Sequence, residues 1–225
     1  MARVVKEHQE RKNEILDTAQ NLFYQNGYDN TPIANVINAV GIAKGTFYHY
    51  FKSKDDLLDQ IIGRIARNID AIIDKVLEEP EENAIVELNN IFNEIGQYKA
   101  QEKKVLIMMT HAIYDESNIV LRSKLTNRRI KTVAPRIAKI ISRGIAEGVF
   151  VTANPEDIAE LILHMGTPLG ERFAEYILNN QLNEQSMNEY VNLCKAYERA
   201  VEKVLGASEK SLNLFDLKVI KEFFK

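Results

Sequence analysis

Cysteine and histidine, the usual ligands of structural metal sites, are scarce in this sequence. The single cysteine, Cys194, excludes a disulfide within the chain and fits a reducing compartment such as the cytoplasm. The four histidines, His8, His49, His111 and His164, are not spaced as zinc ligands usually are. We therefore expect neither a disulfide framework nor a metal centre.

Signatures of an enzyme or a membrane protein are also missing. The sequence has no glycine-rich phosphate loop and no nucleophile beside a recognisable base, so we expect no catalytic activity and no cofactor. It has no apolar run of about 18 residues or more, and its first residues lack the apolar core of a signal peptide. These absences predict a cytoplasmic protein without a membrane span.

Strand-like alternation and internal repeats are absent, whereas apolar residues recur at helical spacing along most of the chain. We expect an all-α fold of about nine to ten helices. A three-helix N-terminal domain would occupy residues 1–58, and a larger helical domain would occupy residues 59–225.

Residues 31–58 are the stretch around which the rest of the chain is organised. Thr31 and Pro32 predict a helix start, with threonine as the N-cap and proline at the first helical position. Gly41 follows, where glycine tolerates the left-handed conformation that often ends a helix. A second short helix is expected over residues 44–51. Helix, glycine turn and second helix form a unit that can enter the major groove of DNA.

The second of these helices has side chains suited to DNA. Donors for phosphates and base edges are Lys44, Thr46, Tyr48 and His49. Phe47 and Phe51, four residues apart, can anchor the helix in a core. The same pattern also fits an ordinary αα-hairpin whose aromatic residues only pack, because helix-turn-helix patterns are weak motifs.

Residues 11–58 resemble the DNA-binding domain of the TetR family of bacterial transcriptional regulators. The run KGTFYHYFKSKDDLL, residues 44–58, is close to the usual pattern of that family. Further matching residues are Ile15, Leu16, Ala19, Leu22, Phe23, Gly27, Tyr28, Thr31, Gly41 and Ile42. The resemblance is strong over the first quarter of the chain and loose over the remainder.

The resemblance implies a set of DNA contacts: Thr31, Lys44, Gly45, Thr46, Tyr48, His49 and Lys54. Thr31 would cap the first helix of the motif near a phosphate. Gly45 would let the backbone approach the DNA closely, and Tyr48 and Lys54 would hold phosphates. The others would face the groove.

Three positions depart from the family pattern. Ala43 replaces the usual serine or threonine, so the second motif helix loses an N-cap oxygen that is typically worth about 1 kcal/mol. Ile37 stands where the family usually has a small residue, so local packing should differ. Ala34 replaces a polar side chain that often contacts DNA, so the first motif helix should read less sequence.

The net charge of −3 is unusual for a DNA-binding protein. Residues 1–58 contain seven lysines and arginines and seven aspartates and glutamates, so this part of the chain is neutral. Its positive groups lie in an N-terminal arm, at Arg3 and Lys6, and around the second motif helix. We therefore expect few phosphate contacts from each subunit and a dependence on dimerisation.

A long helix begins near Lys54 and keeps an apolar stripe until shortly before Pro80. It would connect the small N-terminal domain to the larger one. A tilt of its C-terminal end would then swing the motif at its N-terminal end.

Aromatic, methionine and histidine side chains beyond this helix are candidates to line a ligand cavity. They are Phe92, Tyr98, Met108, Met109, His111 and Tyr114. Methionine and aromatic residues suit an adaptable apolar pocket. Ordinary core packing is the alternative for each of them.

Two amphipathic stretches near the C-terminus, residues 158–177 and 187–205, have the spacing of paired helices. The resemblance implies that they meet their copies in an intersubunit four-helix bundle. Candidate interface residues are Leu161, Met165, Leu169, Phe173, Tyr190, Cys194, Tyr197 and Val201. Packing within one chain is the alternative that the sequence leaves open.

These observations predict a homodimeric transcriptional repressor that binds a pseudo-palindromic operator in double-stranded DNA. A small-molecule inducer of unknown identity would bind the C-terminal domain and release the DNA. The alternative is an architectural or partner-controlled DNA-binding protein without an inducer. An apolar pocket of about 300 Å³ or more would favour the inducer, and a tightly packed core would favour the alternative.

Overall fold

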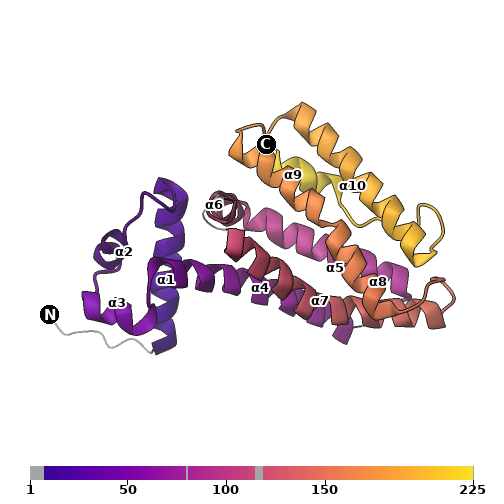
Figure 1. The fold of residues 1–225 in the computed structure, drawn as a ribbon, viewed down its shortest axis with the longest axis horizontal. Helices are drawn as coiled ribbons and strands as arrows, with labels where there is room; N and C mark the ends of the chain where they lie inside the picture. The colour runs from indigo at the N-terminus through magenta and orange to yellow at the C-terminus, as the bar shows by residue number, and fades with distance from the viewer. Residues whose placement is uncertain (1–7, 80, 115–118, 225) are drawn as a thin grey trace. The chain divides into compact units, whose positions relative to one another are not determined.

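The computed structural model describes residues 8–79, 81–114 and 119–224, and within them every regular element is an α-helix (Figure 1). The predicted all-α fold is confirmed. Arg3 and Lys6 of the predicted N-terminal arm lie outside the described residues. The helices are α1 (His8–Asn26), α2 (Ile33–Val40), α3 (Lys44–Tyr50), α4 (Lys54–Glu78), α5 (Ala84–Gln101), α6 (Lys103–Ile113), α7 (Ile119–Ala146), α8 (Pro155–Met165), α9 (Thr167–Leu178), α10 (Glu184–Leu205) and α11 (Leu217–Phe223).

The described residues contain more helices than expected because the stretch predicted as one helix over residues 158–177 is divided. α8 ends at Met165, and the N–H of Gly166 donates to the carbonyl of Ile162. α9 begins at Thr167, and Pro168 has no N–H to continue the ladder.

The chain divides into two compact units. The first comprises Met1–Arg67 and Lys104–Ala112, and the second comprises Asn68–Lys103 and Ile113–Lys225. α4 and α6 therefore each contribute residues to both units.

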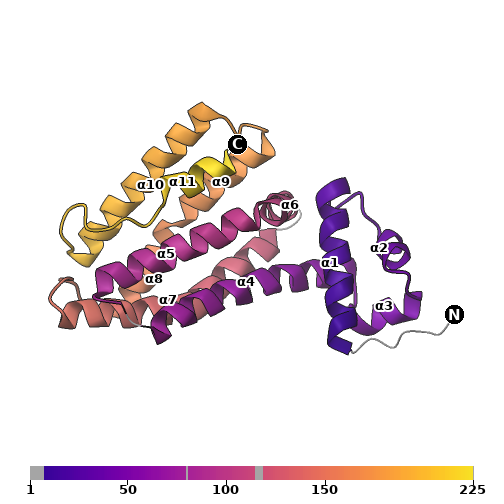
Figure 2. The ribbon, with the colours of Figure 1, turned by 180° about the vertical axis from the view of Figure 1, so that it is seen from behind.

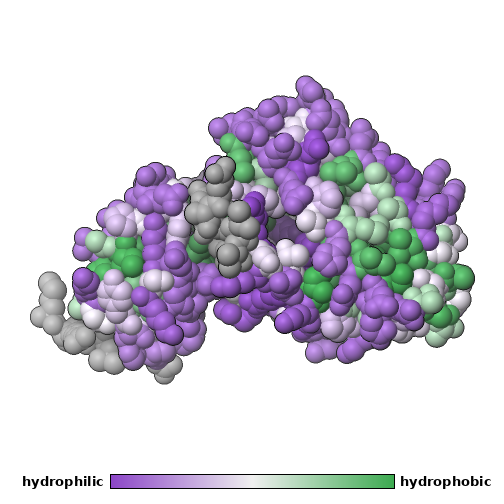
Figure 3. Space-filling model, viewed as in Figure 1, coloured by the Kyte–Doolittle hydropathy of each residue, from purple (hydrophilic) through white to green (hydrophobic). Residues whose placement is uncertain are grey.

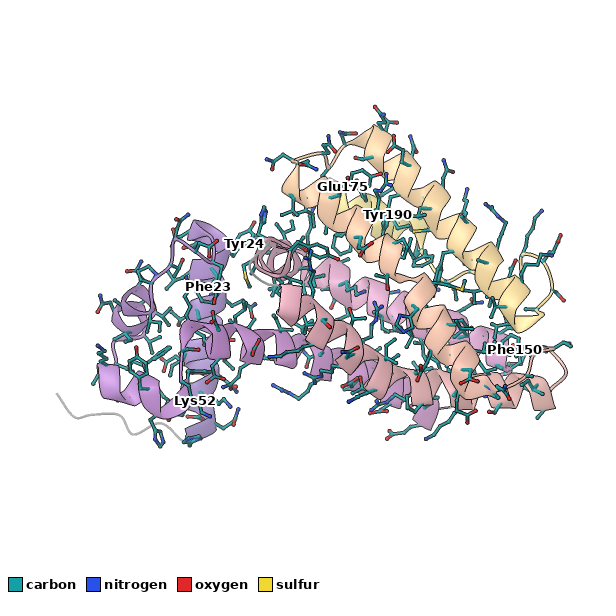
Figure 4. All side chains as sticks on the ribbon, in the orientation of Figure 1. Phe23, Tyr24, Lys52, Phe150, Glu175 and Tyr190 are labelled. Carbon is teal, nitrogen blue, oxygen red and sulfur yellow. The ribbon has the colours of Figure 1, made fainter. Side chains whose placement is uncertain are left out.

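The core of the first unit joins α1, α2 and α3 to the beginning of α4. Phe23 of α1, labelled in Figure 4, is almost completely buried. Val36 of α2, Phe47 of α3 and Leu57 of α4 are buried to the same extent. Apolar side chains from four separate helices thus pack together in one core. This shared core fixes the orientation of the short helix α3.

Two arginines fasten α4, one in each unit. In the first unit, Arg64 of α4 donates to the Asp17 carboxylate and to the Gln20 side chain of α1, both at 2.5 Å. In the second unit, Arg136 of α7 donates to both carboxylate oxygens of Asp74 of α4, at 2.6 and 2.8 Å. The Arg136 hydrogen bonds lower the pKa of Asp74. Bidentate pairing of this kind restricts geometry as well as adding energy.

In the second unit, α7 packs against α5 and α8, and α10 packs against α8 and α9 (Figure 2). Arg143 of α7 donates to the buried carboxylate of Glu87 of α5 at 2.6 Å. Its Nε donates to Glu147 at 2.6 Å. Burial raises the pKa of Glu87, and the charge of Arg143 opposes that shift.

The chain after α10 folds back over the second unit and ends in α11. Glu198 of α10 accepts hydrogen bonds from the N–H groups of Leu214 and Phe215. The ring of Phe224, just after α11, lies 5.8 Å from the ring of Phe173 and 5.8 Å from that of Tyr190. The tail therefore covers apolar side chains of α9 and α10.

Two helical glycines should respond oppositely to alanine. A Cβ on Gly144 of α7 would lie 2.1 Å from the buried ring of Phe150, whereas a Cβ on Gly96 of α5 would meet only Val219, at 3.8 Å. We expect Gly144→Ala to lower the free energy of unfolding by about 1–3 kcal/mol through overpacking. Gly96→Ala should be neutral or should stabilise by up to about 1 kcal/mol, because alanine favours helix.

Urea unfolding of the two variants measures this difference. Gly96→Ala is the matched control, since both glycines lie inside long helices. Equal stability of Gly144→Ala and the parent protein would show that Phe150 has room to move.

Candidate nucleic-acid interface

The turn between α2 and α3 depends on Gly41. This residue has a φ of +71°, and its N–H reaches the carbonyls of Asn38 and Ile37. Glycine adopts this left-handed conformation without the penalty that a Cβ brings. The predicted end of the first motif helix at Gly41 is confirmed.

The buried face of α3 determines which residues point outward. Phe47 and Phe51 are both fully buried, and their ring centroids lie 5.5 Å apart. They anchor α3 and the residue after it in the core of the first unit, as the four-residue spacing predicted. Exposed residues of α3 are Lys44, Gly45, Tyr48 and His49, and Thr46 is half-buried.

Thr31 does not have the predicted role of helix cap. The N-cap of α2 is Pro32, which makes no side-chain capping bond. The Thr31 side chain is fully buried, and its hydroxyl donates to the carbonyl of Gly27 at 2.7 Å, just after the end of α1. The hydroxyl thus stabilises the chain before α2 and faces away from solvent.

Ala43 is the N-cap of α3 and offers no side-chain hydrogen bond. The loss of the usual capping oxygen, predicted from the sequence, is therefore confirmed. α3 has only seven residues. Its position consequently depends on tertiary packing more than on its own ends.

His49 of α3 lies beside the start of α1. Its ring centroid is 5.6 Å from that of His8 and 5.2 Å from that of Tyr50. His8 also lies 4.6 Å from Tyr50. These contacts orient the exposed His49 ring and bring the first described residue of α1 next to the outer face of α3.

Lys54 is engaged within the chain. Its ammonium group lies 4.2 Å from the centroid of the Tyr28 ring and donates to the carbonyl of Asp29 at 3.3 Å. The Tyr28 hydroxyl in turn donates to Asp55 at 2.5 Å. Burial lowers the pKa of Lys54, while the nearby carboxylates oppose that shift. A phosphate would have to share this lysine with an existing set of contacts.

Asn35 and Asn38 of α2 are candidate polar contacts that the sequence analysis did not select. Both are exposed, three residues apart, so they lie on one side of the helix. Amide side chains can donate to and accept from base edges and phosphates. In the sequence, these two residues stand out as polar positions outside the apolar face of the helix.

The predicted ligand residues are divided between the two compact units. Met108 and Met109 are buried, His111 is exposed, and all three belong to the first unit. The other predicted ligand residues, Phe92, Tyr98 and Tyr114, belong to the second unit.

Each of these three second-unit residues has a neighbour within that unit. Phe92 lies against Tyr197, with ring centroids 6.4 Å apart, and the Tyr98 hydroxyl accepts a hydrogen bond from Asn68 at 2.9 Å. Tyr114 lines an open pocket of about 450 Å³.

Four of the eight predicted dimer residues are buried within the second unit. Leu161 is exposed, with half of its surface accessible, and Met165 is half-buried. Residues with little accessible surface are Leu169, Cys194, Tyr197 and Val201. Phe173 and Tyr190 stack on the C-terminal tail. The intersubunit bundle stays a prediction, and a surface for it has to come from the outer faces of these helices.

Among the residues that the structure describes, no group of three or more histidine, cysteine, aspartate or glutamate side chains is arranged to hold a metal ion. No helix in the described ranges is long and apolar enough to cross a membrane.

Two family models match this chain. Residues 15–61 match the model described as "Bacterial regulatory proteins, tetR family". Residues 103–173 match the model described as "Tetracyclin repressor-like, C-terminal domain". The first match contains the whole α2–Gly41–α3 motif.

Curated relatives agree with these models. The chain is 25% identical over 170 residues to the fatty acid metabolism regulator protein of Bacillus subtilis, covering 75% of this chain and 84% of that relative. It is 42% identical over 62 residues to the transcriptional regulator AcrR of Shigella flexneri, covering 27% of this chain and 29% of that relative. The shorter, more similar match has the length of the DNA-binding motif and its flanking helices.

Solved structures show the same fold. A TetR-family transcriptional regulator from Pectobacterium atrosepticum aligns with a TM-score of 0.64 at 17% identity, covering 90% of this chain and 98% of that one. One from Syntrophomonas wolfei also aligns with a TM-score of 0.64, at 20% identity, covering 87% and 96%. Together with the two family models, these similarities show that the chain belongs to the TetR family of bacterial DNA-binding transcriptional regulators.

Proposed function

We propose that this protein is a homodimeric transcriptional repressor that reads a pseudo-palindromic operator with α3 and is released from it by a small-molecule inducer. The observation that carries the proposal is the geometry of α3. Phe47 is held in the core, and the opposite face presents Lys44, Tyr48 and His49 to solvent. A duplex operator as target implies the cytoplasm as the working compartment.

The proposed contacts come from the exposed side of α3. Lys44 and Tyr48 would hold phosphates, and Thr46 and His49 would reach base edges. Gly45 supports this assignment, since a Cβ at this position would meet nothing within 4 Å inside the chain. The fold itself does not need glycine there, whereas a closely approaching DNA backbone would. Thr31 and Lys54 are weaker candidates because the side chain of each already donates a hydrogen bond within the chain.

We also propose that the second unit forms the homodimer. Figure 3 shows hydrophobic residues gathered over α8 on the visible face of this unit. Leu161 of α8 has an exposed apolar side chain, with half of its surface accessible. Burial of such side chains between two copies is the usual driving force for association. Residues 1–58 would then serve DNA binding, and residues 59–225 would serve dimerisation and ligand binding.

Inducer release would act through α4, which contributes to both compact units. Arg64 ties α4 to α1, and Arg136 ties it to α7. A ligand that favours another arrangement of the second unit would thereby displace the motif. It must bind the released form better than the DNA-bound form, because only differential affinity shifts an equilibrium.

The second candidate is a DNA-binding protein controlled by a protein partner, without an inducer. The aromatic cluster of buried Tyr197 with half-buried Phe92 and Phe215 favours it, because space filled by side chains holds no ligand. An open pocket of about 450 Å³ supports the inducer by its size, and its lining is mixed, with charged Arg122 and Glu171 beside apolar Leu178. For this reason we favour control by a small-molecule inducer over control by a protein partner.

Selection of random duplex DNA by the purified protein should recover an inverted repeat. Because a dimer presents two copies of α3, the half-site centres should lie about 34–36 Å apart or a multiple of that distance. Sequencing of the selected pool measures both features. Tyr48→Ala should abolish the enrichment.

The matched control is Tyr24→Ala, since Tyr24 is an exposed tyrosine of α1 in the same unit (Figure 4). This control should recover the same repeat as the parent protein. A pool that contains single half-sites without fixed spacing would contradict the dimer, and a pool without any enriched sequence would contradict sequence reading by α3.

Salt dependence tests the phosphate contact of Lys44. Each phosphate contact contributes about 0.9 to the slope of log K against log salt concentration. Lys44→Ala should therefore lower the magnitude of that slope by about 0.9 for each bound subunit. Fluorescence anisotropy with the selected repeat, at several salt concentrations, gives the slope.

Lys195→Ala on the exposed face of α10 is the control for overall charge. It should leave the slope unchanged. An unchanged slope in Lys44→Ala as well would remove Lys44 from the set of phosphate contacts.

A further inference from the structure

α7 is a long helix whose charged residues all have the same sign. Its 28 residues contain eight of the 29 lysines and arginines of the chain and none of the 32 aspartates and glutamates. The rest of the chain therefore has 21 basic residues against 32 acidic ones. Positive charge is thus concentrated on one helix of the second unit, in a protein whose net charge is −3.

Four of these eight cations have a partner inside the second unit. Arg136 and Arg143 pair with carboxylates of α4 and α5. Arg129 donates to a carbonyl of α8 at 3.0 Å, and the Arg122 guanidinium lies 5.2 Å from the centre of an aromatic ring. These arginines attach α7 to its neighbours.

The other four cations form a stripe along the outer face of α7. At about 100° per residue, they lie within about 80° of one another around the helix axis. At about 1.5 Å per residue, they extend over about 22 Å. The three lysines are exposed and the arginine is half-buried. The members of this α7 stripe are Lys124, Arg128, Lys131 and Lys139.

The apolar face of α7 lies on the opposite side of the helix. Val133, Ile137 and Ile140 are buried in the second unit. Their directions differ from the centre of the α7 stripe by about 140–160°. Core packing therefore holds the stripe outward.

Acidic residues in the described ranges leave the α7 stripe uncompensated. The ion pairs of α7 are made by Arg136 and Arg143, and no stripe residue has one with a described residue. The Arg136 hydrogen bonds are the main cause of the lowered pKa of Asp74, and the charge of Lys139 adds to it. Arg136 already binds both oxygens of that carboxylate. Solvated surfaces usually mix both signs, so a face of this kind indicates an anionic partner.

Duplex DNA fits the α7 stripe better than an anionic membrane does. A helix that binds a membrane surface inserts its apolar face, and the apolar face of α7 is buried in the second unit. Over about 22 Å a duplex presents about 13 phosphate charges, so each stripe residue can meet a phosphate. Lysine and arginine bind phosphates without reading bases.

The α7 stripe also supplies what the first part of the chain lacks. The chain belongs to a DNA-binding family, yet residues 1–58 have as many acidic as basic residues. Sequence-independent binding depends on the number of phosphates that a protein neutralises. We propose that the α7 stripe is a second DNA contact surface, which holds duplex DNA of any sequence through its phosphates. This inference goes beyond the proposed function, since it requires neither an inducer nor base reading by α3.

Salt dependence of binding to a duplex of random sequence tests the proposal. The variant is Lys124→Ala/Lys131→Ala/Lys139→Ala in the full-length protein. Each phosphate contact contributes about 0.9 to the slope of log K against log salt concentration, so the variant should lower the magnitude of the slope by about 2.7 for each bound subunit. At about 50 mM salt it should bind the duplex about tenfold or more weakly than the parent protein. Fluorescence anisotropy measures both quantities.

Lys75→Ala/Lys195→Ala/Lys218→Ala is the matched control. It removes three exposed lysines from other helices of the second unit and so changes the net charge by the same amount. The control should keep the slope of the parent protein. An equal loss of slope in both variants would show an effect of overall charge and overturn the proposal. An unchanged slope in the stripe variant would overturn it too.

Charge-preserving substitutions separate a DNA contact from a structural role. Lys124→Arg/Lys131→Arg/Lys139→Arg should keep the parent slope, because arginine also binds phosphates. The alanine variant should keep the thermal midpoint of the parent protein, because alanine favours helix at exposed positions. A loss of slope in the arginine variant as well would overturn the proposal.

Competition with poly-L-glutamate tests an acidic protein as the partner. Unlabelled duplex should displace the labelled duplex from the parent protein, and poly-L-glutamate at the same concentration of charge should not. Equal displacement by both polymers would overturn DNA as the partner and indicate an acidic protein surface.

Selection of random duplex DNA keeps this inference distinct from the proposed function. The stripe variant should recover the same inverted repeat as the parent protein, because phosphate contacts read no bases. Failure of the parent protein to enrich any repeat would contradict the proposed function, and the slopes on random duplex would still test the stripe. Enrichment of the repeat, together with a parent-like slope in the stripe variant, would overturn only the present inference.

Discussion

Burial of Phe47 is the interaction on which the DNA-facing surface depends. α3 has seven residues and an alanine N-cap, and a helix this short is not stable by itself in water. Its position comes from Phe47 and Phe51, which enter the same core as Phe23 of α1 and Leu57 of α4. The outer face of α3 is therefore as rigid as that core. Arg64 extends the connection along α4, so that a force on α4 acts on the whole motif.

Sequence patterns predicted the parts of this structure that burial determines. Helical spacing located the buried faces, and Gly41 located the turn, because a left-handed residue at a helix end requires glycine in most contexts. Short polar residues were harder to interpret. Thr31 precedes proline as an N-cap would, yet its hydroxyl donates backward to the carbonyl of Gly27. A hydroxyl or amide can satisfy donors or acceptors on either side of it, and local sequence does not distinguish them.

Long-range packing explains what the sequence did not reveal. An apolar stripe shows that a helix face is buried but not what buries it, so Cys194 and Val201 fitted an intersubunit bundle as well as an intrachain core. The C-terminal tail, held by Glu198, covers part of that region.

The weak charge of the first unit limits how tightly one subunit could hold DNA through its motif. Residues 1–58 are neutral, so this part of each subunit of the proposed homodimer would make few phosphate contacts, and operator affinity would depend on both copies of α3 binding at once. A small displacement of one motif would then remove about half of the contacts. A ligand needs a differential affinity of only about 5.5 kcal/mol to move such an equilibrium almost completely.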